Sequence, residues 1–437
     1  MFSRSANVSK LIFRVRRNCT AMNDTERRVL EHIDVDGMMR FIETLISTPS
    51  FGGKETAAQK VVAEKLRNLG FTVDIWMIDF DELGKHPDYS MSIPRDEGMG
   101  VVGAWGEGEP SLMLCGHIDT VAPGELGNWD TPPLEATIKD GRLYGRGVAD
   151  MKAGLACGIY AVKALMDAGV KPKGRVLLAS VIGEEDGGCG ALATSLRYSA
   201  DAGVIMEPTE AKVAPEIAGA MSFTVAVPGR GVHACVREEG VSAVEKFITL
   251  FNGLRELERE RNDGVDDPLY GRYRTPYAVN VGTVEGGSWP GTVPERVVFK
   301  ARLGVKVGES KEEARRQLEV KVDEIAYGDP WLMENRPEVR WDGYSFASSM
   351  VPVDHPIVAA VAESYRDVTG VEPVYEGMTY ASDARLLIDV GGIPTVVFGP
   401  GDVRVAHGPN ESVCLEELTT VVETLALTVI RFLGCEG

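Results

Sequence analysis

The sequence predicts an α/β protein with a mainly parallel, covered sheet and a smaller α+β domain inserted into it. Short, continuous apolar runs that alternate with helical segments indicate strands buried in such a sheet. In the middle of the chain, alternating strands beside a long amphipathic helix indicate a second sheet with one face in water. A chain of 437 residues also exceeds the size at which one hydrophobic core stops growing, so we expect two domains.

The elements of the larger domain follow from apolar spacing. Helical periodicity predicts helices over residues 38–46, 55–68, 153–168 and 356–369. Period-two alternation predicts a strand over residues 71–76. Continuous apolar runs predict four buried strands, at residues 112–115, 176–182, 204–206 and 395–398.

The middle segment has a different pattern. Residues 222–227 alternate as a strand with one wet face does, and residues 241–260 read as a long amphipathic helix. Strands are expected over residues 278–284 and 296–305, and a charged helix over residues 311–325. We therefore assign residues 23–217 and 340–437 to the larger domain, and residues 218–339 to the insertion.

Composition limits the classes of partner. The formal net charge is −19, which disfavours nucleic acid and anionic lipid because both are polyanions. No uninterrupted apolar run approaches the roughly 18 residues of a membrane-spanning helix. The seven cysteines are scattered without C-x-x-C spacing, which favours a reducing compartment, so we expect a cytoplasmic location.

The beginning of the chain differs from the rest. Residues 1–21 carry five basic side chains and no acidic one, and their apolar run at residues 11–13 is too short for a signal peptide. We expect residues 1–22 to be a disordered arm or a segment placed upstream of a true start at Met22.

Residues that commonly bind metals follow the predicted buried strands. In open α/β sheets, ligands bind just beyond the carboxyl ends of the strands, so these side chains are expected at one edge. Taken singly, Glu207 is more typical of a turn or helix-cap carboxylate, and a local hydrogen bond explains His117 and Asp119 equally well. Their joint placement favours a metal site. The set comprises His117, Asp119, Glu184, Glu185, Glu207 and His407, with Asp150 at the start of the helix expected over residues 153–168.

The donor types indicate the kind of metal site. Imidazole and carboxylate donors without cysteine suit catalytic zinc or a similar divalent ion. Two histidines with three acids exceed the usual three protein ligands of one catalytic ion, so two ions sharing a bridging carboxylate fit better. The adjacent side chains of Glu184 and Glu185 diverge, so one can bind metal while the other acts as a base. Asp119 can fix the tautomer of His117.

Several motifs resemble those of the M20 metallopeptidase and deacylase family. This group includes acetylornithine deacetylase, succinyl-diaminopimelate desuccinylase, aminoacylase-1 and the glutamate-releasing carboxypeptidases. The similarity is collinear from about residue 37 to residue 434. The motifs are Gly-His117-Ile-Asp119, Gly-Arg-Gly-Val-Ala-Asp150-Met-Lys152, Glu184-Glu185, Glu207-Pro-Thr and Ala-His407-Gly-Pro-Asn-Glu411.

The resemblance implies roles for these residues. It implies that His117 and Glu207 hold one zinc ion, that Glu185 and His407 hold the other, and that Asp150 bridges them. Either ion could be cobalt instead of zinc. Glu184 is similar to the family's general base, and Asp119 to the partner of His117. Glu207 stands where the carboxypeptidase branch more often has Asp, which favours the deacetylase and desuccinylase branch.

The resemblance also covers the inserted domain. Residues 218–339 are similar to the family's ferredoxin-like lid, through which its members form homodimers, and the rest to its zinc-peptidase-like catalytic domain. His233 matches the histidine that reaches the partner subunit's active site and polarises the substrate carbonyl. Two positions depart from the family. Gly291-Thr-Val-Pro294 lacks the usual Asn, and Gly304 replaces the usual carboxylate-binding Arg.

Two arginines are therefore candidates for binding a substrate carboxylate. Arg302 lies two residues before Gly304 and would face the same way in a strand. Arg385 belongs to a turn that resembles the family's substrate side, although Asp383 and Arg385 could equally form an ion pair that fixes the loop.

These expectations lead to one main function. We expect a dinuclear metal amidohydrolase that removes an acyl group from an N-acyl amino acid or a similar small amide. The alternative is a dipeptidase or carboxypeptidase that uses the same site. A small-molecule binding protein without catalysis is a third class, which the intact ligand set disfavours.

Overall fold

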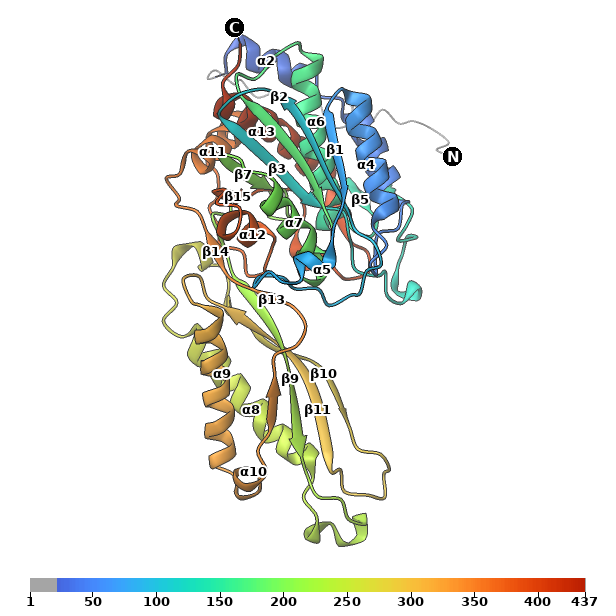
Figure 1. Ribbon diagram of the computed structural model, residues 1–437, viewed down its shortest axis with the longest axis vertical. Coiled ribbons are helices and arrows are strands. Elements are labelled where there is room, and N and C mark those ends of the chain that lie inside the picture. The colour runs from blue at the N-terminus through green and yellow to red at the C-terminus, as the bar shows by residue number, and fades with distance from the viewer. Residues whose placement is uncertain (1–21, 437) are drawn as a thin grey trace. The chain divides into compact units, whose positions relative to one another are not determined.

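The computed structural model describes residues 22–436, which fold as two compact units (Figure 1). The first unit contains the chain up to residue 215, residues 350–376 and the chain from residue 382 onward. The second contains Glu216–Ser349 and Gly377–Ala381. Residues 1–21, which include nearly all of the expected N-terminal arm, lie outside the described residues.

The helices and strands of the first unit alternate along the chain. Its helices are α2 (Asp24–Glu31), α3 (Val35–Ile46), α4 (Thr56–Leu69), α5 (Phe80–Leu83), α6 (Ala153–Asp167), α7 (Cys189–Arg197), α11 (Pro356–Thr369), α12 (Ala384–Asp389) and α13 (Leu415–Leu433). The strands of its main sheet are β1 (Thr72–Met77), β2 (Met99–Gly106), β3 (Ser111–His117), β6 (Arg175–Val181), β7 (Ala202–Ile205) and β15 (Thr395–Val397). A small sheet contains β4 (Thr137–Lys139), β5 (Arg142–Tyr144) and β16 (Ser412–Cys414).

The main sheet confirms the predicted α/β class. Its strand order is β1-β2-β6-β3-β7-β15, and β6, β3, β7 and β15 run parallel to one another. All seven residues of β3 are buried, as expected for the continuous apolar run in the centre of a covered sheet. The sequence patterns missed β2, which pairs antiparallel with both β1 and β6.

Helices cover both faces of this sheet (Figure 1). On one face α4 packs on β1 and β2, α6 on β3 and β6, and α13 on α6 and α11. On the other face α7 packs on β2 and β6 and contacts α12. With both faces buried, the carboxyl ends of the parallel strands are the open edge at which polar side chains can gather.

The second unit is a separate α+β sandwich. Its main elements follow the order β9 (Gly219–Pro228), α8 (Ala243–Asn262), β10 (Val279–Gly286), β11 (Arg296–Val305), α9 (Lys311–Tyr327) and β12 (Glu338–Arg340), with α10 (Pro330–Glu334) before β12. The antiparallel sheet has the order β10-β11-β9-β12, and β13 (Ser345–Phe346) also pairs with β9. The short strands β8 (Glu216–Ile217) and β14 (Ser349–Met350) pair with each other.

The core of the second unit lies between its sheet and its two long helices. Apolar residues of β9 and β11, among them Phe223 and Phe299, pack against Leu254 of α8 and Leu318 of α9. The alternation that predicted β9 thus places one face of the sheet in this core. Among the described residues, no helix is long and apolar enough to cross a membrane.

Candidate metal centre

The predicted ligands come from the carboxyl ends of the parallel strands. His117 is the last residue of β3, and Glu207 lies two residues after β7. Glu184 and Glu185 form part of a short 3-10 turn that follows β6. Because β6, β3 and β7 are neighbours in the sheet, their ends place these four side chains at one edge.

The other two predicted ligands come from loops. Asp150 lies in the turn Val148–Lys152, which directly precedes α6. His407 belongs to the loop between β15 and β16 and has a positive φ of 61°. Its side chain is 55% exposed, so this ligand stands at the open side of the group.

Six of these side chains form two groups of possible metal ligands. His117, Glu184 and Glu207 form one group, and Asp150, Glu185 and His407 form the other. Within each group the ligand atoms all lie within 4.8 Å of one another. Glu184 therefore lies where a ligand could, although the sequence motif suggests a base.

Asp150 lies between the two groups. Its Oδ1 is 2.9 Å from Nε2 of His117, and its Oδ2 is 3.2 Å from Nε2 of His407. Nε2 of His407 also lies 2.9 Å from Oε2 of Glu185, and Nε2 of His117 lies 3.7 Å from Oε1 of Glu207. The two oxygens of one carboxylate thus face the two groups, which is the arrangement of a bridging ligand.

Asp119 contacts the site in a way that the sequence did not predict. Nδ1 of His117 lies 3.0 Å from the backbone carbonyl oxygen of Asp119 and 3.6 Å from its carboxylate Oδ1. Oδ2 of Asp119 instead accepts a hydrogen bond from the backbone N–H of Glu185, at 3.1 Å. The carbonyl therefore holds the ring of His117, and the carboxylate holds the backbone of a neighbouring ligand.

The environment of the buried acids at this site disfavours their ionised forms. Burial raises the pKa of Glu207 to about 8, and it raises the pKa values of Glu184 and Glu185 above their usual range. His407 has its pKa raised to about 10, chiefly by its hydrogen bonds to Asp150 and Glu185. Burial opposes the charge on Asp150, but the hydrogen bonds with His117 and His407 outweigh it and lower the pKa of Asp150.

This electrostatic arrangement fits divalent cations. The two groups contain four carboxylates and two imidazoles. Glu184 and Glu207 are buried, and buried charges need a compensating partner. The donors are carboxylate oxygens and imidazole nitrogens, which are the ligands of catalytic zinc sites. The residues present therefore suit two divalent ions that share Asp150.

Asp383 and Arg385 lie in the first unit, at the start of α12. The Asp383 carboxylate is 2% exposed, its two oxygens have no hydrogen-bond partner among the described residues, and burial raises its pKa to about 7. Arg385 is equally buried and donates a hydrogen bond to the Gly187 carbonyl, at 2.9 Å. This hydrogen bond joins the start of α12 to the loop after Glu184 and Glu185, and a substrate-binding role for Arg385 stays a prediction.

The remaining predicted residues lie in the second unit. Arg302 is partly buried on β11, donates to the carbonyl of Thr379 at 3.1 Å, and has no carboxylate partner among the described residues. Gly304 has no room for a side chain, because a Cβ would lie 2.9 Å from the backbone of Tyr277. His233 is exposed and accepts a hydrogen bond from the backbone N–H of Cys235.

Sequence reasoning gave no role to Arg146 or Glu411. Both are buried in the first unit, and their side chains form an ion pair of 2.6 Å. The sequence did show that Glu411 is the last residue of the motif that contains His407, and that Arg146 lies four residues before Asp150 in the other motif. A buried acid in a ligand loop needs donors, but the sequence did not identify which ones.

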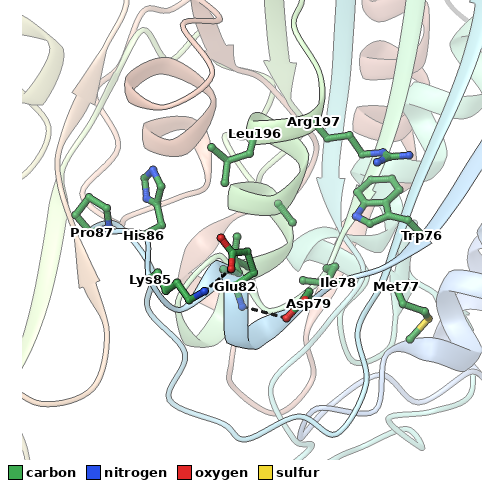
Figure 2. A pocket seen from close by; sticks show the side chains of 12 residues that line it. Trp76, Met77, Ile78, Asp79, Glu82, Lys85, His86, Pro87, Leu196 and Arg197 are labelled. Atoms are coloured by element: carbon green, nitrogen blue, oxygen red, sulfur yellow. Dashed lines mark hydrogen bonds and ion pairs between the residues drawn. The ribbon is translucent and has the colours of Figure 1, made fainter.

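A concave region of the first unit is separate from the ligand groups. It has a volume of about 590 Å³ and lies beside the end of β1, α5 and the end of α7 (Figure 2). Its polar side chains pair with each other or with near neighbours: Lys85 with Glu82 at 2.5 Å, and Arg197 with Asp74 at 2.8 Å. None of the predicted ligands lines it.

Comparison with known proteins gives a consistent family. Residues 113–431 match the model of peptidase family M20/M25/M40. The chain is 30% identical to an N-formyl-4-amino-5-aminomethyl-2-methylpyrimidine deformylase from Halalkalibacterium halodurans, over 91% of this chain and 95% of that protein. It is also 30% identical to an acetylornithine deacetylase from Myxococcus xanthus, over 76% of this chain and 83% of that protein.

Solved structures agree on the fold. The di-peptidase Dug1p from Saccharomyces cerevisiae superimposes with a TM-score of 0.75, covering 94% of this chain and 99% of that one, at 16% identity. A tripeptidase from Staphylococcus aureus gives a TM-score of 0.70 at 22% identity, covering 92% of this chain and 99% of that one.

Proposed function

The chain belongs to peptidase family M20/M25/M40, a family of hydrolases, and on that premise we propose that it is a dinuclear metal-dependent amidohydrolase acting on a small N-acyl compound. The observation that carries the proposal is the position of Asp150, whose two carboxylate oxygens lie 2.9 Å and 3.2 Å from the imidazoles of the two ligand groups. In this proposal His117 and Glu207 hold one ion, and Glu185 and His407 hold the other.

Glu184 is the general base of the proposed reaction. Bound divalent ions would supply a Lewis acid that makes water more acidic and polarises the amide carbonyl. Glu184 takes a proton from the attacking water and gives it to the departing amine. Burial raises the pKa of Glu184 above its ordinary value, and the side chain lies beside His117 and Glu207, where it can exchange a proton with a water held at the site.

The relatives favour a short acyl group. Two relatives named as pyrimidine deformylases are 30% and 29% identical to the chain, over 95% and 96% of their own lengths. We therefore propose a formyl group on a primary amine as the first candidate substrate. An acetylated or succinylated amino acid is the next candidate, because Arg302 has no carboxylate partner among the described residues and could bind a substrate carboxylate.

We further propose a homodimer formed through the second unit. Three apolar side chains stand exposed on α8, at spacings that place them on one face: Val244, Ile248 and Phe251 are 40%, 50% and 37% exposed. In such a dimer the exposed His233 would serve the partner subunit and stabilise the oxyanion that develops on the substrate. Neither the dimer nor the cytoplasmic location is tested by the fold, and both stay predictions.

Amine release from a panel of amides tests the function. The panel contains N-formyl amines without a carboxylate, N-acetyl and N-succinyl amino acids, and dipeptides. The protein is assayed after chelation and again after zinc or cobalt is restored. We expect cleavage only with metal and chiefly of N-formyl compounds. Cleavage of dipeptides alone would make the chain a peptidase, and cleavage unaffected by chelation would contradict the metal site.

A further inference from the structure

The carboxylate of Glu411 accepts four hydrogen bonds from the segment that carries Asp150. Its Oε2 accepts from Nη1 of Arg146 at 2.6 Å and from the N–H of Gly147 at 2.9 Å. Its Oε1 accepts from the N–H groups of Ala149 and Asp150 at 2.8 Å and 3.1 Å. Glu411 is only 1% exposed, so these four bonds take the place of water around its carboxylate.

Arg146 extends this network to the other loop ligand. Its Nη2 donates to the carbonyl of His407 at 3.3 Å and to that of Gly408 at 3.1 Å. The guanidinium lies over the ring of Trp129, 5.1 Å from the ring centroid, and the side chain is 2% exposed. One ion pair therefore joins the segment of Asp150 to the loop of His407.

The two ligand groups differ in what holds them. His117 and Glu207 follow β3 and β7, which are hydrogen-bonded neighbours with Cys115 opposite Ile205. The sheet itself thus fixes their separation. Asp150 and His407 belong to loops far apart in the sequence, and the bonds of Arg146 and Glu411 tie those loops together.

We propose that Arg146 and Glu411 are positioning residues that set the distance between Asp150 and His407, and thereby the affinity of the second metal ion. This inference rests on the proposed dinuclear function. Hydrogen-bonded partners of metal ligands typically change metal affinity by about 10- to 100-fold when removed. Here the larger loss should fall on the ion bound by Glu185 and His407, because the network holds both Asp150 and the loop of His407, whereas the ion bound by His117 and Glu207 shares only Asp150 with it.

Two substitutions remove the network in different ways. Glu411→Gln replaces a charged acceptor of four bonds by an amide whose NH₂ group faces N–H donors. Arg146→Lys keeps the charge but loses the planar fork that contacts Glu411 and two carbonyls at once. Glu26→Gln is the matched control, because Glu26 is a buried carboxylate paired with Arg431 at 2.8 Å on α2 and α13.

Calorimetric titration of the metal-free protein with Zn²⁺ tests the proposal. His407→Ala identifies which of the two binding steps belongs to the second ion. We expect Glu411→Gln and Arg146→Lys to weaken that step about 10- to 100-fold, and Glu26→Gln to leave both steps unchanged. The melting temperature of each metal-free variant shows whether it folds, and if Glu411→Gln does not, Arg146→Lys gives the same comparison.

The outcomes separate this inference from the proposed function. Two wild-type steps that are unchanged in both variants, or weakened equally, would overturn the positioning role and leave the dinuclear site intact. A wild-type protein that binds fewer than two Zn²⁺ ions would overturn the dinuclear function itself. Weakening chiefly of the second ion's binding step supports both the positioning role and the dinuclear function.

Discussion

The backbone carbonyl oxygen of Asp119 lies 3.0 Å from Nδ1 of His117, which directs Nε2 of the same ring toward Asp150. A backbone group therefore orients this imidazole. The Asp119 carboxylate is left to hold the N–H of Glu185. One residue thus supports a ligand from each of the two groups.

This division of roles predicts unequal effects of substitutions at Asp119. Asp119→Asn keeps an oxygen that can accept from the N–H of Glu185, whereas Asp119→Ala removes it. We expect Asp119→Ala to weaken Zn²⁺ binding by about 10-fold or more, and Asp119→Asn to weaken it less. Calorimetric titration of both metal-free variants measures this. Equal losses would mean that the charge of the carboxylate matters more than its hydrogen bond.

Substitution of Glu184 distinguishes a base from a ligand. Glu184 lies within reach of His117 and Glu207, so proximity alone allows either role. We expect Glu184→Gln to reduce kcat by about 10²- to 10⁴-fold, the usual contribution of a general base, with two metal ions still bound per chain. Metal analysis beside steady-state kinetics checks this. Loss of one ion from the variant would make Glu184 a ligand.

Arg302 provides a test of substrate class. Its guanidinium has no carboxylate partner among the described residues, and burial lowers its pKa. If it binds a substrate carboxylate, Arg302→Met should raise KM for N-acyl amino acids by about 10-fold or more while leaving N-formyl amines unaffected. The ratio of kcat/KM for the two substrate types is the readout. An equal loss for both would assign Arg302 a structural role through its bond to the carbonyl of Thr379.

Glu216 predicts a pH dependence of stability away from the metal site. Burial, and then the neighbouring Asp267, raise the pKa of Glu216 to about 7 from an ordinary value near 4.5. The folded chain therefore holds a proton more tightly than the unfolded chain. This contribution is complete below about pH 4.5 and is lost as the pH rises through 7. The free energy of unfolding of Glu216→Gln, relative to that of the wild type, should therefore be larger at pH 8 than at pH 5.

Urea unfolding at the two pH values measures this effect, with both proteins free of metal. The urea concentration at half unfolding should rise for the variant, relative to the wild type, between pH 5 and pH 8. A difference that does not change with pH would show that Glu216 keeps an ordinary pKa.

The fold was predictable where one segment carries its own pattern. Continuous apolar runs identified β3, β6, β7 and β15, and period-two alternation identified β9. The missed strand β2 contains Gly100 and Gly103, where a Cβ would collide with Trp76 and approach Leu66. Glycines at positions of close packing weaken the apolar pattern of a strand. The pattern of residues 99–106 alone therefore did not predict β2.

The site was predictable in its residues but not in its contacts. Strand ends and donor types singled out the six side chains that the structure gathers into two groups. The carbonyl contact of Asp119 depends on local backbone geometry, which a residue type does not encode. The pairing of Arg146 with Glu411 spans 265 residues and is one of many pairings that a sequence allows.

The number of Zn²⁺ ions that restore amine release tests the dinuclear site most directly. Metal-free protein receives Zn²⁺ in steps, and hydrolysis of an N-formyl amine and bound metal are measured on the same samples. We expect two ions per chain at full activity. Because Asp150 faces both groups, Asp150→Asn should lose both ions and the activity with them. Full activity in a protein that binds one ion, or an active Asp150→Asn variant, would contradict a site built on a shared carboxylate.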